Sequence, residues 1–577
     1  MFRGLDSSSV TSCHRDEKSE NHGWTRIFFV PDALRRPGPK HPCPSVFIRG
    51  SFPVRLGRFR KEDTMPSPHH EPLHIGSRLE LFIDDELIDR LGGAERRLHH
   101  PVPQEVSIVF DRPWEGNHSG GQSVVRTDDG RYRLYYSAGR QGLAEYRDDS
   151  ADWVDPSLIF GCYAESSDGI NWTRPSVGQV EVAGTRDNNI VLTPEIGGRS
   201  PGAIGPFEDT RPDVPADERF KGVSGLSGRV FAYCSADGVN WRLLNDEPVI
   251  EGYDSEHFAF WDSDREEYRC YCRHRRIAAY QAGMEELNVA PLETDDRTGL
   301  TADGLDNGRD ITTSTSKDFI QWTRPEFISY SPGRVNELYE NVIQPYYRAP
   351  HIIIGFPMRY LDRGWTAALE AMPGYEQRRK RAAQFSDREG TAMTDAMLMS
   401  SRDRSHFEMW PESFIRPGLG VVNNWTYWDN YVAGGMIETA SRVDGAPDEI
   451  SLYVTEKILR PGPSQVRRHT LRVDGFVSVC APLCGGEMLT RPIVFEGSEL
   501  VMNYSTSAAG SVQVELQDAQ GIPLPGFALA DSEVMYGDSL EQRMLWKNNP
   551  DLSAWAGTPV RLRFVLKDAD LFSIRFR

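Results

Sequence analysis

The sequence predicts an all-β protein, with a five-bladed β-propeller followed by a C-terminal β-sandwich. A short phrase ending in an aromatic residue recurs four times, and each copy follows a segment that alternates in the manner of strands. Units of four short strands that repeat in this way are typical of propellers. Residues 476–577 alternate apolar and polar side chains over several strands, with Gly and Pro at the turns, which is typical of a sandwich.

The repeated phrase has the pattern Ser-x-Asp followed by three residues and a bulky aromatic. It occurs at residues 166–172, 235–241, 316–322 and 401–407. In the first two copies an Asp-Gly pair favours a tight turn, and the aromatic side chain is placed to fill the space beside the next strand. We therefore expect the phrase to be structural and not catalytic.

Five segments supply the strands of the blades. The first starts near Gly120, the second near Ala203, and the third with a hairpin at residues 257–275. The fourth starts around Glu340, and the fifth, which lacks the repeated phrase, starts around Trp428. A strand that precedes the first blade often completes the last one, and we assign this closing role to residues 78–89.

The chain divides into three parts. Residues 1–64 lack the apolar core of a signal peptide and are rich in Arg, Pro and Ser, so they are either a disordered leader or the result of a start codon assigned too early. Residues 65–475 form the propeller and residues 476–577 the sandwich. Because no signal is visible, a cytoplasmic location is slightly favoured, and the compartment and the oligomeric state stay open.

Composition excludes several classes of partner. The net charge of −19 argues against nucleic acid and against an anionic membrane, since both need a basic surface. No apolar run approaches the ~18 residues of a membrane span. The eight cysteines show neither a disulfide framework nor zinc spacing, so we expect no metal and no other cofactor.

Carboxylates stand near the predicted start of the inner strand in all five blades, where propellers place residues around the mouth of the central channel. Two carboxyl groups that converge there suit cleavage of a glycosidic bond, because one donates a proton and the other attacks or activates water. The candidate catalytic residues are Glu115, Asp209, Asp254, Glu256 and Glu340.

Aromatic and polar residues accompany these acids. Trp rings stack on the apolar faces of sugars, while Asn, Arg and His bind hydroxyl groups. The candidate substrate-binding residues are Trp114, Asn117, His118, Arg211, His257, Trp425, Trp428 and Asp429.

Together, the five predicted blades, the repeated phrase, the acids and the appended sandwich resemble the five-bladed-propeller glycoside hydrolases, over about residues 80–577. These are the invertase and fructanase type, with the arabinanase and xylosidase type as relatives. The resemblance implies that inner strands of the first three blades carry a nucleophile or base, a stabiliser of the transition state and an acid. The motifs differ: residues 114–117, 208–212 and 254–256 replace Asn-Asp-Pro-Asn, Arg-Asp-Pro and Glu-Cys. The resemblance therefore implies a divergent branch and does not extend to fructose specificity.

The sequence thus predicts a glycoside hydrolase that acts on an oligosaccharide or polysaccharide. Two alternatives stay open. A carbohydrate-binding propeller without catalysis would keep the aromatic residues and need no paired acids. A glycoside phosphorylase on the same fold would need cations for phosphate, which residues 273–276 could supply.

Overall fold

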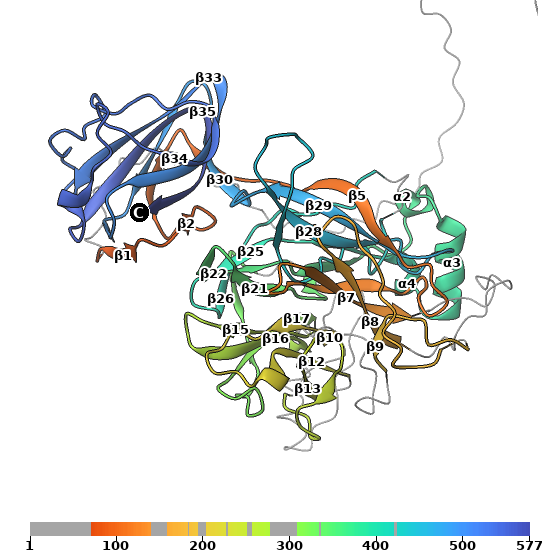
Figure 1. The fold of residues 1–577 in the computed structure, drawn as a ribbon. Helices are drawn as coiled ribbons and strands as arrows, with labels where there is room; N and C mark the ends of the chain where they lie inside the picture. The colour runs from red at the N-terminus through yellow and green to blue at the C-terminus, as the bar shows by residue number, and fades with distance from the viewer. Residues whose placement is uncertain are drawn as a thin grey trace, which may run out of the picture. The chain divides into compact units, whose positions relative to one another are not determined.

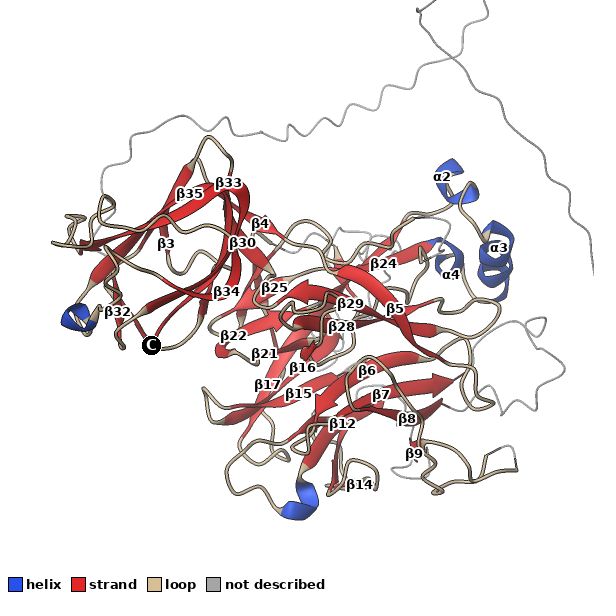
Figure 2. Ribbon diagram, turned by 45° about the horizontal axis from the view of Figure 1, so that its top comes forward, coloured by secondary structure: helices blue, strands red, loops and turns tan. Residues whose placement is uncertain are grey.

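The computed structural model describes residues 71–139, 159–182, 184–193, 204–226, 229–250, 257–276, 308–333, 336–419 and 424–577. The predicted leader at residues 1–64 and the candidate acids Asp254 and Glu256 lie outside these ranges. The described residues form β-strands with a few short helices, which confirms the all-β prediction (Figure 2).

Five sets of mainly antiparallel strands follow one another along residues 102–472 (Figure 1). The first contains β6 (Gly120–Arg126), β7 (Tyr132–Gly139), β8 (Ile159–Ser166) and β9 (Ile190–Leu192). The second contains β11 (Phe207–Glu208), β12 (Phe220–Leu226), β13 (Arg229–Ser235) and β14 (Arg242–Leu243). The third contains β15 (His257–Asp262), β16 (Glu267–Arg275), β17 (Arg309–Ser316) and β18 (Glu326–Phe327), with β10 (Ile204–Gly205) parallel to β15.

The fourth and fifth sets each recruit a strand from outside the segment predicted for them. The fourth contains β21 (Ile343–Tyr346), β22 (Ala349–Gly355), β25 (Met399–Ser401), β26 (His406–Met409) and β19 (Ser329–Ser331). Beside it, β20 (Glu337–Leu338), β23 (Met358–Asp362) and β24 (Ala392–Ala396) form a three-stranded sheet. The fifth contains β27 (Ile437–Thr439), β28 (Glu449–Glu456), β29 (Gln465–Arg472) and β5 (Val102–Val109).

The strand that completes the fifth set is β5, so the closing role predicted for residues 78–89 is wrong. β5 pairs antiparallel with β29, whereas β2 (Glu80–Leu81) pairs with β35 (Val560–Phe576). Most residues of β5 are exposed or only partly buried, as expected of an edge strand. The β5 sequence therefore lacks the run of apolar side chains that residues 78–89 contain.

The C-terminal region forms one ten-stranded hydrogen-bonded sheet. Besides β2 and β35 it contains β1 (Leu73–Gly76), β3 (Ile88–Gly92), β4 (Glu95–Leu98), β30 (Val477–Ala481), β31 (Gly486–Thr490), β32 (Ile493–Phe495), β33 (Leu500–Asp518) and β34 (Asp538–Arg543). Residues 73–98 thus belong to this sheet, whereas the sequence predicted the C-terminal β-structure from residues 476–577 alone. The two-layered sandwich and the domain bounds stay predictions.

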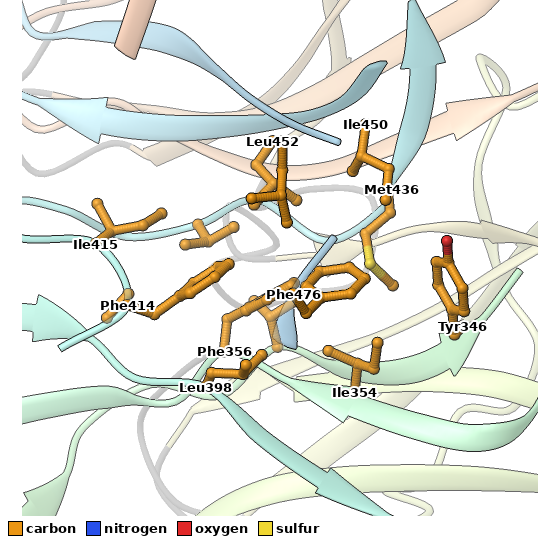
Figure 3. Close-up of a cluster of buried hydrophobic side chains, with 14 of the residues drawn as sticks. Tyr346, Ile354, Phe356, Leu398, Phe414, Ile415, Met436, Ile450, Leu452 and Phe476 are labelled. Atoms are coloured by element: carbon orange, nitrogen blue, oxygen red, sulfur yellow. The ribbon is translucent and has the colours of Figure 1, made fainter. Parts of the chain in front are cut away.

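A large apolar core connects this sheet with the fourth and fifth sets (Figure 3). The rings of Phe356 and Phe414 stack with centroids 5.4 Å apart, and Phe476 lies 6.3 Å from Phe414. Leu81 and Ile83 belong to the same buried cluster. The apolar side of residues 78–89 is therefore used in this core, where each fully buried side chain contributes about 1.5–3 kcal/mol.

The repeated phrase forms the turns expected of it. In the first copy the Asp168 carboxylate accepts hydrogen bonds from the backbone N–H groups of Ile170 and Asn171, both at 2.8 Å. Burial would raise the pKa of Asp168, but these bonds lower it to about 2. The aromatic residues pack beside the turn, and Trp241 of the second copy is buried. The structural role of the phrase is confirmed.

The helices α2 (Ala367–Glu370), α3 (Tyr375–Gln384) and α4 (Arg388–Thr391) follow β23 and precede β24 in the chain, and they lie close together (Figure 2). They occupy a charge-rich insertion within the fourth set. The remaining short helices are η2 (Ala216–Glu218) and η4 (Ser553–Trp555). None of the helices in the described ranges has the length and apolar character needed to cross a membrane.

Candidate active site

The inner strands of the five sets are β6, β10 with β11, β15, β21 and residues 431–434, and two neighbouring pairs of them are parallel where they meet. Ile204 of β10 pairs with His257 of β15, and Ser123 of β6 forms a parallel bridge with Gly434. Parallel strands begin at the same end. We call this end the entry end and the opposite one the exit end.

Aromatic rings gather at the entry end. The His118 ring lies 4.4 Å from the Trp428 ring, which stacks on Tyr431 at 6.1 Å with an interplanar angle of 11°. Tyr339 lies 6.1 Å from Trp428 and 5.1 Å from Tyr427. These rings come from three separate segments, which precede the inner strands of the first, fourth and fifth sets.

A buried carboxylate lies among these rings. Glu340 is 5% exposed, and burial together with the charge of Glu340 raises the pKa of Tyr431. The guanidinium carbons of Arg273 and Arg309 lie 4.2 and 5.0 Å from the centroid of the Tyr339 ring. The site therefore combines an acid, aromatic faces and cationic hydrogen-bond donors.

Several buried polar atoms at the entry end have no hydrogen-bond partner among the described residues. They include Nε2 of His118, both side-chain polar atoms of Asn341, Nε1 of Trp428 and the hydroxyl of Tyr431. Buried polar groups are paired in the great majority of cases, so a cluster of unpaired ones indicates a place where a polar ligand or water binds. Burial and the charge of Arg381 lower the pKa of His118 to about 4, so its ring is neutral at pH 7.

Glu115 and Trp114 lie elsewhere, in the core between the first and fifth sets. The Glu115 carboxylate accepts hydrogen bonds from Tyr136 Oη at 2.6 Å and from Arg174 Nε at 2.9 Å. Burial raises the pKa of Glu115, and the charge of Arg174 opposes this shift. Trp114 donates to Asn189 at 3.0 Å. These contacts give both residues a structural role.

The position predicted for Asp209 at the start of an inner strand is wrong. β11 ends at Glu208, so Asp209 follows its inner strand and lies at the exit end. The Asp209 carboxylate accepts hydrogen bonds from Lys221 Nζ at 2.6 Å and from Tyr268 Oη at 2.5 Å. Arg211 lies over the Tyr268 ring. Asp209 lies at this end because β10 and β11 both precede it in the segment that starts near Ala203.

A cavity of about 770 Å³ opens at the exit end. The carboxylates that line it are paired: Arg219 Nη2 donates to Asp128 at 2.8 Å, and Arg219 Nε donates to Glu208 at 2.7 Å. Burial raises the pKa of Glu208, and the Arg219 contacts oppose the shift. We place the candidate site at the entry end, because several buried polar atoms there have no hydrogen-bond partner among the described residues.

The remaining candidates frame the entry end. Asp429 is buried and bonded to Arg460, to the Thr426 hydroxyl and to the N–H of Ile458, and burial raises its pKa. The Trp425 indole donates to the backbone carbonyl of Gly418 at 3.0 Å.

The two further candidates at the entry end are Asn117 and His257. The Asn117 carbonyl accepts from Leu459 N–H. His257 is buried at the first position of β15, opposite Cys272 of β16. Among the described residues no group of three or more His, Cys, Asp or Glu side chains could hold a metal ion.

Sequence reasoning missed Tyr339, Asn341 and Tyr431, although each stands within two residues of a candidate that it named. It also missed the arginines of α3. The run Arg378-Arg379-Lys380-Arg381 was visible, but a basic helix is ordinarily solvated, and only packing reveals which of these side chains is buried.

No family model matches this chain, and no curated protein matches it in sequence. Several solved structures are similar at low identity. An α-L-arabinofuranosidase from Fusarium graminearum is 12% identical, with 66% of this chain and 99% of that chain covered and a TM-score of 0.33. A β-fructofuranosidase from Bombyx mori is 11% identical, with coverages of 83% and 94% and a TM-score of 0.31. An N-acetylgalactosamine deacetylase from F. plautii is 12% identical, with coverages of 66% and 96% and a TM-score of 0.35.

Each of the three TM-scores is below 0.5, so no argument about this chain rests on them.

Proposed function

We propose that this chain is a glycoside hydrolase that acts on an oligosaccharide or polysaccharide at the entry end of five propeller blades, formed by the five sets of strands. The observation that supports this function best is the buried Glu340 among the Tyr339, Trp428 and Tyr431 rings, next to polar atoms without partners. A sugar meets both needs of such a site, because its ring faces are apolar and its hydroxyl groups donate and accept hydrogen bonds.

Glu340 is the carboxyl group that we assign to the reaction. Glycosidic cleavage uses one carboxylic acid to protonate the leaving oxygen and a second carboxylate to attack the anomeric carbon or to activate water. Glu337 is the nearest described acid in sequence, but Arg309 holds it in an ion pair at 2.6 Å. The second carboxylate is therefore proposed to be Asp254 or Glu256, which precede β15 in the sequence.

The polar atoms without partners are assigned to the sugar hydroxyl groups. The neutral His118 ring and the Asn341 amide each offer a donor and an acceptor. In this proposal the stacked Trp428 and Tyr431 rings form the wall of the site.

The experiment is a screen of the purified chain against furanosides, pyranosides and natural oligosaccharides, with Glu340→Gln beside the wild type. General acid catalysis contributes about 10²–10⁴-fold, so we expect kcat of the variant to fall by at least about 100-fold. The control is Glu412→Gln, because the side chain of Glu412 is about half exposed and its ion pair with Arg416 is also on the surface.

Unchanged turnover in a folded Glu340→Gln protein would refute the catalytic assignment. Sugar binding without turnover by the wild type would instead support the alternative of a carbohydrate-binding propeller.

A further inference from the structure

The insertion in the fourth set places arginine side chains inside the protein. Of the four consecutive basic residues in α3, Arg378 is 3% exposed and Arg381 is 4% exposed, whereas Arg379 is on the surface. Arginine is rarely buried without a partner, because removing a guanidinium from water costs several kcal/mol. The burial of two such groups therefore requires compensation.

Arg378 makes no ion pair within the described part of the protein, and the charge of the Asp429 carboxylate compensates it only from beyond ion-pair distance. Its guanidinium donates only to two neutral groups, the backbone carbonyls of Trp425 at 2.7 Å and Gly390 at 3.3 Å, and its buried Nε has no partner. None of the described carboxylates lies within ion-pair distance of it. Burial and the charge of Arg460 lower the pKa of Arg378 to about 10.

Two further arginines share one carboxylate. Glu389 accepts from Arg381 Nη2 at 2.6 Å, and the same carboxylate lies 3.8 Å from Arg388. A buried nitrogen of each arginine, Nη1, has no hydrogen-bond partner. Positive charge therefore exceeds negative charge where α3 and α4 meet.

These arginines adjoin the entry end. Arg378 bonds to the backbone of Trp425, and Arg388 lies 5.4 Å above the Tyr427 ring, which is 5.3 Å from Trp428. The charge of Arg381 reaches His118, which contacts the same Trp428 ring. The excess positive charge thus borders the aromatic cluster proposed to bind the sugar.

We propose that Arg378, Arg381 and Arg388 form a subsite for an oxyanion, the anionic group of the molecule on which this enzyme acts. Guanidinium groups match the geometry of carboxylates, sulfates and phosphates and bind them through paired hydrogen bonds. The inference rests on the proposed function for its place in the reaction. It deepens that function by naming the substrate class, which is an acidic or sulfated sugar; the same subsite would bind inorganic phosphate if the chain is the phosphorylase alternative.

The test measures anion binding directly, without turnover. The melting temperature of the full chain is recorded with sodium sulfate, sodium phosphate or sodium galacturonate, each against sodium chloride at equal ionic strength. A ligand that binds the native state raises the melting temperature as its concentration exceeds Kd. We expect at least one of the three anions to produce such a rise in the wild type.

Variants locate the effect. Arg378→Gln and Arg381→Gln should each reduce the anion-dependent rise at least severalfold, whereas Arg379→Gln, a neighbour exposed on the same helix, should retain it. If Arg378→Gln does not fold, the same measurement is made on Arg381→Gln and Arg378→Lys. A wild type that responds to none of the anions, or a response that survives both substitutions, would overturn the inference.

The outcomes separate this inference from the proposed function. Anion binding without cleavage of any sugar supports the subsite and contradicts the hydrolase. Cleavage of neutral sugars with no anion effect supports the hydrolase and contradicts the subsite. When anion binding and cleavage are both found, cleavage that requires phosphate supports the subsite and replaces the hydrolase with a phosphorylase, and a preference for acidic or sulfated sugars identifies the substrate's own group as the anion.

Discussion

The entry and exit ends of the inner strands differ in how their buried polar groups are satisfied, although the exit-end cavity also has one buried atom without a partner, Nε2 of Gln344. At the exit end, a cavity of about 770 Å³ is lined by carboxylates that hold fixed partners, as Asp209 holds Lys221. At the entry end, Asn341 and Tyr431 contain buried polar atoms without partners, and Arg378 has no carboxylate partner among the described residues. Unpaired polar groups therefore mark a candidate site better than the volume of a cavity does, because a paired charge is already stabilised without a ligand.

The largest expected effect is at the exit end. Lys221→Met would leave the buried Asp209 carboxylate without its cation, so we expect the free energy of unfolding to fall by about 3–5 kcal/mol. Urea denaturation measures this change. Lys317→Met, which removes a largely exposed lysine, is the control. A loss below about 1 kcal/mol would show that the Asp209 pair does not stabilise the exit end.

An intermediate effect is expected from His118. Its folded-state pKa of about 4 lies below the ordinary 6.5, so the unfolded chain takes up a proton that the folded chain does not. The stability that this contributes is present above pH 6.5 and is lost as the pH falls toward 4. The ring is only partly buried, so solvent screening leaves about 1–2 kcal/mol.

The check is the pH dependence of unfolding in wild type and His118→Phe. Between pH 4 and 6.5, the free energy of unfolding should depend less steeply on pH in His118→Phe than in the wild type. His469, whose pKa burial also lowers to about 4, contributes in the same direction in both proteins and cancels. Identical slopes would mean that His118 is protonated in the folded state.

The smallest expected effect has the opposite sign. Asn341→Leu replaces an amide whose polar atoms have no partner, so we expect the free energy of unfolding to rise by about 1 kcal/mol while sugar binding weakens. Asn503→Leu is the matched control, because the buried Asn503 amide donates to Val473 and accepts from Arg472, so this change should destabilise. Destabilisation of similar size in both variants would show that Asn341 is satisfied after all.

The turns of the repeated phrase show what local sequence determines. Asp168 bonds to the backbone two and three residues further on, and so needs nothing from distant parts of the chain. The third copy has Phe319 where the first has Gly169, and Phe319 keeps the left-handed φ of 68° that Gly adopts freely. Burial of the Phe319 ring against Tyr268 and Trp322 holds it in that conformation, so even here the turn draws on tertiary packing.

The sequence by itself determined the β class, the turns and several entry-end residues, among them His118, Glu340 and Trp428. It could do so because alternation and turn chemistry act over a few residues. Only the tertiary structure decided that β5 completes the fifth set, that Glu115 and Asp209 are held in ion pairs, and that Arg378 is buried. Those outcomes depend on which distant segments of the chain meet. Tyr268 donates a hydrogen bond to Asp209, and Arg378 donates one to the Trp425 carbonyl, and no local pattern encodes contacts over such separations.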